Sequence, residues 1–192
     1  MKNPHHSSSS KGFTLIELLV VIAIIGTLAA AGFSVGPAII NSAKKTSGMA
    51  TASAIAMAVE QYYTEYAALP ADSDSVSTDT QLDSTTNGIG TLNILAGEDV
   101  NGQNPRKIRF LSVKQAKNGI DGAVYTGNSI SKIVDPFGEP YFIRLDYDYD
   151  EVLRFTPNGS TAVTLRGRRV AVHSLGVKKN GTPTAKTLIK TW

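Results

Sequence analysis

The chain has 192 residues, of which 42% are hydrophobic and 18% charged, a composition typical of one globular domain with a short addition. It contains no cysteine, which excludes disulfide frameworks, thiolate metal sites and cysteine nucleophiles. The formal net charge of +3 is too small to indicate a nucleic-acid-binding protein by itself.

The first forty residues differ in composition from the rest of the chain. Residues 1–12 contain two lysines and no acid, and residues 13–40 contain one charged residue, Glu17. From Leu18 to Ile40 there are 23 consecutive uncharged residues. A helix of that length spans roughly 35 Å, against about 30 Å of bilayer hydrocarbon. We therefore expect residues 13–40 to form a membrane-spanning helix.

Three kinds of protein are compatible with this segment: a secreted protein with a cleaved signal peptide, a protein with a plain membrane anchor, and a filament subunit stored in the membrane. The alanines Ala29–Ala31 are similar to a signal-peptidase site, and cleavage there gives a mature protein that starts near Gly32. Glu17 argues against a signal peptide, because a carboxylate within an apolar helix costs a few kcal/mol and needs a partner.

The segment KGFTLIE, from Lys11 to Glu17, followed by LLVVIAIIG, resembles the class III signal of type IV pilins and pseudopilins. The resemblance implies that a prepilin peptidase cuts between Gly12 and Phe13 and then methylates the new amino group of Phe13. Methylation keeps the positive charge of an amine. We expect Glu17 of one subunit to pair with the Phe13 amine of a neighbour, since two charges about 4 Å apart attract by around 4 kcal/mol at an effective dielectric of 20.

The helix continues beyond the apolar segment as an amphipathic half, which we place at residues 41–69, ending before Pro70. Gly32, Gly36 and Pro37 predict a kink between the two halves. We expect Tyr62, Tyr63 and Tyr66 to serve in packing. The apolar stripe at intervals of three and four consists of Ala52, Ile55, Val59, Tyr62, Tyr66 and Leu69.

The remaining residues, 70–192, predict a small domain with a mainly antiparallel sheet. We expect a short helix at 92–96 and strands at 108–114, 141–147, 152–156 and 168–175. The fold class is therefore α+β, a long N-terminal helix packed on a small sheet. The polar stretch 70–104 contains acids that do not have the spacing of a calcium loop and are interpreted as a solvated loop: Asp72, Asp74, Asp79 and Asp83.

Three further segments are similar to the major pseudopilin of type II secretion, the general secretion pathway G protein. They are the helix end from Ala56 to Pro70, the turn DPFGEPY at 135–141, and VHSLG at 172–176 together with the terminal Trp192. The resemblance implies a pilin-like fold. We interpret the turn as structural, because its prolines fix φ and its glycine permits a tight bend. The residues of this structural turn are Asp135, Pro136, Gly138, Pro140 and Tyr141.

The chain departs from that family where the family holds calcium. The resemblance implies carboxylates after the last strand, but residues 160–192 contain no Asp or Glu. We therefore expect no cofactor and no metal site there. In the acidic run 146–151, Asp146, Asp148 and Asp150 would lie on one face of a strand, which we interpret as a solvated edge.

No catalytic arrangement is apparent, and we do not expect an enzyme. His173 and Ser174 are adjacent in an expected strand and point to opposite faces, which excludes a dyad between them. The last third is basic, and we expect it to meet acidic segments of neighbouring subunits, at 72–83 and 146–151. DNA or anionic lipid are the alternative partners. The basic residues are Arg166, Arg168, Arg169, Lys178, Lys179, Lys186 and Lys190.

The sequence thus predicts a prepilin with a leader at residues 1–12, an assembly helix at 13–40, the amphipathic half at 41–69 and a periplasmic domain at 70–192. The expected protein is a single-pass subunit of the bacterial inner membrane that polymerises into a type II secretion pseudopilus. Its expected partners are copies of itself, minor pseudopilins, the prepilin peptidase and the inner-membrane assembly platform. The alternatives are a type IV or competence-type pilin and a secreted binding module.

Overall fold

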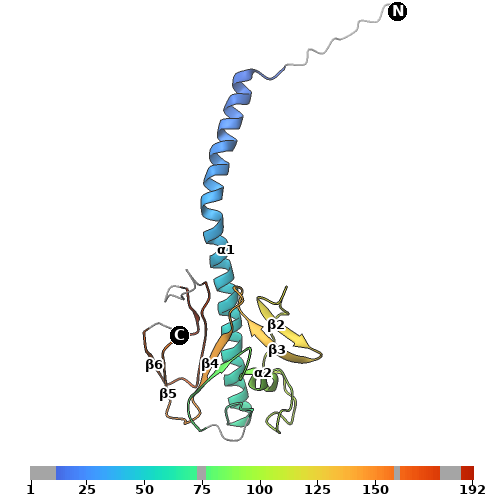
Figure 1. The fold of residues 1–192 in the computed structure, drawn as a ribbon, viewed down its shortest axis with the longest axis vertical. Coiled ribbons are helices and arrows are strands. Elements are labelled where there is room, and N and C mark those ends of the chain that lie inside the picture. The colour runs from blue at the N-terminus through green and yellow to red at the C-terminus, as the bar shows by residue number, and fades with distance from the viewer. Residues whose placement is uncertain (1–11, 73–76, 158–160, 178–186) are drawn as a thin grey trace, which may run out of the picture. The chain divides into compact units, whose positions relative to one another are not determined.

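The computed structural model describes residues 12–72, 77–157, 161–177 and 187–192, except for the side chains of 31–35. The chain divides into two compact units, Met1–Ser42 and Ala43–Trp192, and each is described by itself. Figure 1 shows the elements in chain order, which are α1 (Leu15–Tyr66), β1 (Thr80–Asp83), α2 (Ile89–Leu95), β2 (Gly122–Thr126), β3 (Ser129–Val134), β4 (Tyr141–Leu145), β5 (Val152–Phe155), β6 (Val163–Arg166), β7 (Val170–Ser174) and β8 (Ile189–Lys190).

In the first unit, helix α1 begins at Leu15 and exposes its apolar side chains. Phe13 is 81% exposed and Leu15 82%, and the exposure of the large apolar residues stays at 44% or more as far as Leu28. The helix extends past Pro37, which lies inside it, and the predicted kink stays a prediction. Among the residues that the structure describes, no helix is long and apolar enough to cross a membrane.

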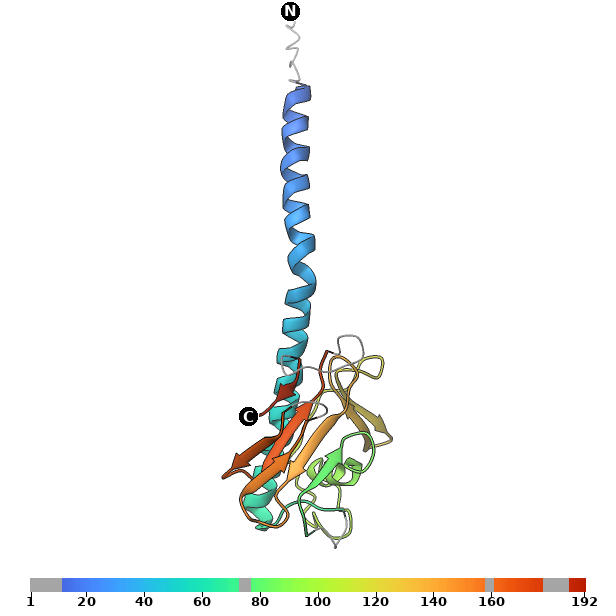
Figure 2. The ribbon, with the colours of Figure 1, turned by 60° about the vertical axis from the view of Figure 1, so that its left-hand side comes forward.

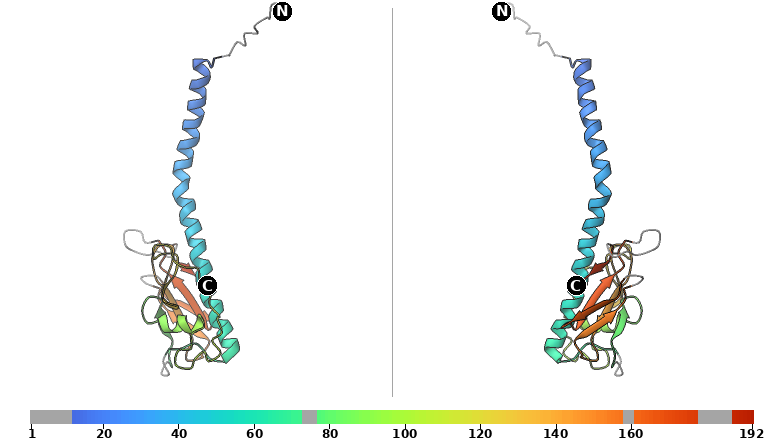
Figure 3. Two further views of the ribbon diagram at one scale, coloured as in Figure 1. Left: turned by 90° about the vertical axis from the view of Figure 1, so that its right-hand side faces the viewer. Right: turned by 90° about the vertical axis from the view of Figure 1, so that its left-hand side faces the viewer.

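In the second unit, the rest of α1 packs on the domain by the predicted stripe. Ile55 and Val59 are fully buried, and Tyr62 is 1% exposed. The helix ends at Tyr66, slightly before the predicted end, because Ala67 adopts a positive φ of 53° and donates its N–H to the Tyr63 carbonyl. Both views of Figure 3 show this part of the helix running alongside the strands.

A four-stranded antiparallel sheet in the order β1-β4-β7-β8 forms the centre of the domain (Figure 2). Tyr141, Ile143 and Leu145 alternate along β4 and join the core that contains Ile55 and Tyr62. The alternate residues of β4 and β7 lie on the other face of the sheet, because side chains in a strand alternate with a period of two. Two separate hairpins, β2–β3 and β5–β6, complete the fold.

The α+β class is therefore confirmed, and the architecture is consistent with a pilin-like fold. The strands predicted at 141–147, 152–156 and 168–175 correspond to β4, β5 and β7, and the short helix corresponds to α2. The expected strands do not include β1, β2, β3, β6 or β8.

The strand predicted at 108–114 is wrong, because this segment has no ladder partner. The N–H groups of Phe110 and Leu111 both donate to the Leu95 carbonyl at the end of α2, at 2.9 and 2.8 Å. The Ile108 N–H donates to the side chain of Asn104. Phe110 packs against Tyr62 and Tyr66 of α1, with ring centroids 5.5 and 6.1 Å apart, and Leu111 is buried. These apolar residues therefore join the core without pairing as a strand.

Candidate functional site

The start of α1 is closed by a capping box between Thr14 and Glu17. The Thr14 backbone N–H and its hydroxyl both donate to Glu17 Oε2, at 2.8 and 2.7 Å, and the Glu17 N–H donates to Thr14 Oγ1 at 3.3 Å. Such a reciprocal arrangement satisfies N–H groups that have no partner within the helix. Glu17 Oε1 takes part in none of these bonds.

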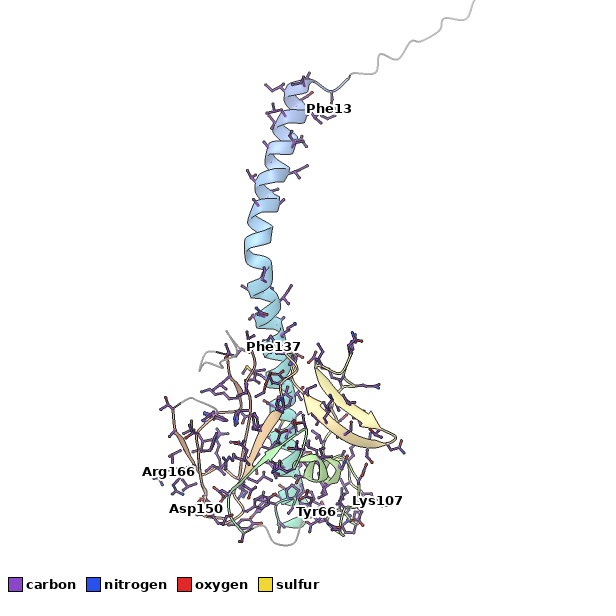
Figure 4. All side chains as sticks on the ribbon, viewed as in Figure 1. Phe13, Tyr66, Lys107, Phe137, Asp150 and Arg166 are labelled. Atoms are coloured by element: carbon purple, nitrogen blue, oxygen red, sulfur yellow. The ribbon has the colours of Figure 1, made fainter. Side chains whose placement is uncertain are left out.

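The expected cleavage position lies just before this cap. Gly12 and Phe13 precede the first helical residue, in backbone without regular structure, and both are exposed. Figure 4 shows Phe13 at the beginning of the helix, with the side chains of the first turns projecting from its sides. The geometry leaves the peptide bond between Gly12 and Phe13 outside the helical hydrogen bonding.

In the DPFGEPY segment, the carboxylate of Asp135 organises a tight turn. Its Oδ1 accepts the N–H groups of Phe137 and Glu139, both at 2.8 Å, and its Oδ2 accepts the Ser174 hydroxyl at 2.5 Å. Gly138 has a φ of 87°, a conformation that favours glycine. Burial raises the pKa of Asp135, while these hydrogen bonds act in the opposite direction.

The same turn packs against α1. The hydroxyl of Tyr141 donates to the carbonyl of Gly48 at 3.1 Å. A Cβ added to Gly48 would lie 3.1 Å from Pro136 Cδ and 2.5 Å from Ile189 Cδ1, so the helix approaches the turn closely at this glycine. Lys44 Nζ lies 5.5 Å from the ring centroid of Phe137. The turn residues thus hold the second half of α1 on the domain.

Two interpretations of the acidic residues are wrong. Asp146 is 1% exposed, and the chain turns away after Leu145, so Asp146 does not share a solvated strand edge with Asp148 and Asp150. Asp79, interpreted as part of a solvated loop, is only partly exposed and contributes with Asp146 and Asp148 to a group of carboxylates within 4.8 Å of one another. Asp74 lies outside the described residues.

Burial and like charges act together in this group. Burial raises the pKa of Asp79, and the carboxylates of Asp148, Asp146 and Asp150 raise it further. Burial likewise raises the pKa of Asp146. Asp150 behaves differently, because its ion pair with Arg154, at 3.1 Å, lowers its pKa.

His173 and Ser174 point to opposite faces, as expected. The Ser174 hydroxyl binds Asp135, while His173 lies among Phe142, Phe155 and Trp192, with ring centroids 5.2 to 5.7 Å away. His173 is 1% exposed, and burial lowers its pKa to about 4. A histidine held neutral in an aromatic cluster is a packing residue.

Part of the basic surface is used within the subunit. Arg169 donates to Glu60 Oε2 at 3.4 Å and lies 4.2 Å from the ring centroid of Tyr63. Arg166 and Arg168 are exposed and line a groove of about 730 Å³ against α1. Figure 4 shows Arg166 near Asp150 at one edge of the domain. Lys178, Lys179 and Lys186 lie outside the described residues.

Comparison with known proteins decides the character of the amino terminus. Residues 7–33 match the family model of the prokaryotic N-terminal methylation motif. The chain carries a prepilin-type signal of the type IV pilin-like class, which supports processing by a prepilin peptidase and assembly into filaments. No curated protein and no solved structure matches the chain.

The sequence reasoning missed two features of these sites. The capping box has a recognisable signal, because Thr14 and Glu17 stand three residues apart immediately before an apolar run. The meeting of Asp79 with Asp146 had no local signal, since it depends on the pairing of β1 with β4.

Proposed function

We propose that this protein is a filament subunit of the type II secretion pseudopilus. In this proposal the peptidase cuts between Gly12 and Phe13, Phe13 is N-methylated, and the helix from Phe13 to Ile40 waits in the inner membrane with the domain in the periplasm. The prepilin-type signal at residues 7–33 carries the proposal. The pseudopilin assignment within the class rests on the sequence similarity of the turn at 135–141.

The surface of the first half of α1 supports assembly through this segment. Its large apolar side chains, from Leu15 to Leu28, are exposed to the extent of 44% to 82%. Burying apolar area contributes about 25 cal/mol per Å², so covering these side chains with lipid or with the helices of other subunits is strongly favourable. The membrane step rests on the 23 uncharged residues from Leu18 to Ile40.

Glu17 has two roles to separate in this scheme, namely capping its own helix and pairing with the Phe13 amine of a neighbour. Glu17→Gln keeps an oxygen that accepts from the Thr14 N–H but removes the charge, whereas Glu17→Ala removes both. We expect both variants to be cleaved normally and to assemble poorly. Glu65→Gln, which removes a charge from the far end of the same helix, is the matched control and is expected to assemble normally.

The first experiment is the mass and amino-terminal sequence of the protein recovered from its native membrane, followed by filament incorporation of the three variants. A methylated Phe13 start supports the proposal. A start near Gly32 indicates a secreted module with a signal peptide, and an intact Met1 indicates a plain anchor. Normal assembly of Glu17→Gln would assign Glu17 to capping and remove the charge-pairing step.

A further inference from the structure

The carboxylates of Asp79, Asp146 and Asp148 converge because of strand pairing. β1 pairs with β4 in antiparallel register, with Thr80 opposite Leu145. Asp79 comes directly before β1, and Asp146 directly follows β4, so the two residues meet at the same end of the ladder. One carboxylate oxygen from each of the three aspartates lies within 4.8 Å of the others.

A second observation is that two of these carboxylates keep unsatisfied buried oxygens. Asp146 is 1% exposed, and its Oδ2 accepts the Glu151 N–H at 3.0 Å, but its Oδ1 has no hydrogen-bond partner. Asp79 Oδ1 is also buried and has no partner. A buried acceptor without a partner is costly, and a buried carboxylate oxygen is more so. Both orphaned oxygens belong to the same three-carboxylate group.

None of the three aspartates forms an ion pair with a protein cation within the part of the chain that the structure describes. The four ion pairs found there involve Glu60, Glu65, Asp121 and Asp150, and none involves the three aspartates. The charge of Asp79 acts to raise the pKa of Arg144. The Arg144 guanidinium, however, lies 5.6 Å from the ring centroid of Phe155 and forms none of these ion pairs.

We propose that Asp79, Asp146 and Asp148 bind a divalent cation, and that this cation is Ca²⁺. Carboxylate oxygens without nitrogen or sulfur ligands select hard cations. Ca²⁺ accepts irregular sets of oxygen ligands supplied by turns and completes them with water, whereas Mg²⁺ demands a near-ideal octahedron. A bound ion would link the residue before β1, Asp79, to the turn after β4, which contains Asp146 and Asp148. None of the three aspartates lies in 160–192, where the resemblance implies the calcium site.

The test uses the full chain in detergent micelles, first freed of metal with EDTA and then titrated with CaCl₂ up to about 10 mM, above the roughly 0.1–1 mM dissociation constants of extracellular calcium modules. Thermal unfolding measures the stabilisation that follows from binding to the folded state. Luminescence of Tb³⁺, excited through Tyr147 and Tyr149 beside the aspartates, measures occupancy directly. MgCl₂ at equal concentration measures ion selectivity.

Asp148→Asn is the decisive variant, because Asp148 is exposed and an asparagine oxygen can still accept the Asp150 N–H. In EDTA we expect it to raise Tm, since it removes one of three like charges. With CaCl₂ we expect the order to reverse, because the variant loses affinity by at least about tenfold. Glu98→Gln removes a carboxylate outside the group and is the control for net charge.

A wild-type Tm that rises saturably with CaCl₂, and does so in Glu98→Gln but far less in Asp148→Asn, supports the site. The proposal is overturned if CaCl₂ shifts all three proteins equally or shifts none. It is also overturned if Mg²⁺ stabilises the wild type more than Ca²⁺ does, or if Asp148→Asn leaves Tb³⁺ luminescence unchanged.

Discussion

Helix α1 contains two apolar stretches with opposite surroundings. From Leu15 to Leu28 the large apolar residues occupy every side of the helix and are exposed, whereas Ile55, Val59 and Tyr62 form one stripe and are buried to 99% or more. A helix that is apolar all round needs cover from outside its own domain, and a helix with one apolar stripe needs a single surface. The pattern therefore separates the part of the helix that packs on the domain from the part whose apolar side chains are exposed.

The two stretches also differ in how closely they tolerate a neighbour. Gly48 lets α1 approach Pro136 and Ile189, and the Tyr141 hydroxyl binds the helix backbone at the same point. A Cβ added at Gly26, in the first unit, would have no neighbouring atom within 4 Å. Close packing is thus specified at Gly48 by the glycine and the Tyr141 hydroxyl together, whereas Gly26 in the first apolar stretch has no comparable neighbour.

The largest effect that separates the two stretches is expected from a matched pair of truncations. Ile55→Ala leaves a cavity in a fully buried site and should lower the free energy of unfolding of the domain by about 2–5 kcal/mol. Ile25→Ala, at a residue that is 60% exposed, should change it by less than about 0.5 kcal/mol. Denaturant unfolding of both variants measures this. Equal losses would contradict the division of the helix into a packed and an uncovered part.

The close approach at Gly48 should give the next largest effect. Gly48→Val places methyl groups where Pro136 and Ile189 already lie, so we expect a loss of about 1–3 kcal/mol from overpacking. Ala50→Val introduces the same β-branched side chain at an exposed position two residues further along the helix. Its lower helix propensity should reduce the free energy of unfolding by only about 0.5 kcal/mol. Thermal unfolding distinguishes the two. Similar unfolding midpoints for the two variants would show that the turn shifts to accommodate the larger side chain at residue 48.

Much of this division could be predicted from the sequence, because it depends on periodicity. The stripe through Ile55 and Tyr62 and the uninterrupted apolar run after Glu17 are local patterns, and the prepilin-type signal is a contiguous motif. The segment 108–114 shows the limit of such patterns. Leu111 is buried there and Phe110 and Val113 are partly buried, but the segment does not pair, since a strand is defined by a partner elsewhere in the chain.

The sites show the same limit. The turn of Asp135 could be placed from its prolines and glycine, but its hydrogen bond to Ser174 depends on β7 lying beside it. The alternation of Asp146, Asp148 and Asp150 in the sequence predicts a solvated strand edge. The chain turns after Leu145, which buries Asp146 and places it near Asp79, directly before β1. Charge patterns predict exposure only while the backbone stays extended.

Ionisable groups extend the comparison, because Glu17 is exposed in the first unit and His173 is buried in the second. Burial lowers the pKa of His173 to about 4, below about 6.5 in the unfolded chain. The neutral form is thus favoured on folding, and the stability present above pH 6.5 is lost as the pH falls towards 4. The expected loss at pH 5 is about 2 kcal/mol relative to pH 7.

His173→Phe fills the aromatic cluster without a titratable group and should remove this part of the pH dependence. Asp135, Asp79 and Asp146 have raised pKa values, so their burial becomes less costly as the pH falls, which is an effect of opposite sign. These groups are present in both proteins, so the difference between wild type and variant isolates the histidine. Parallel pH profiles of the free energy of unfolding would mean that folding does not lower the pKa of His173.

The smallest expected effect is at the helix start. Thr14→Ala removes the hydroxyl from the capping box and should cost about 1 kcal/mol, confined to the first turn. Thr27→Ala, whose hydroxyl donates to Ile24 within the helix, is the matched control. Amide exchange of residues 15–18 in micelles measures the local loss. If Glu17 serves assembly through its charge, Thr14→Ala should still form filaments while Glu17→Gln does not, because the carboxylate survives in the first variant alone. The reverse result would assign the residue to its own helix.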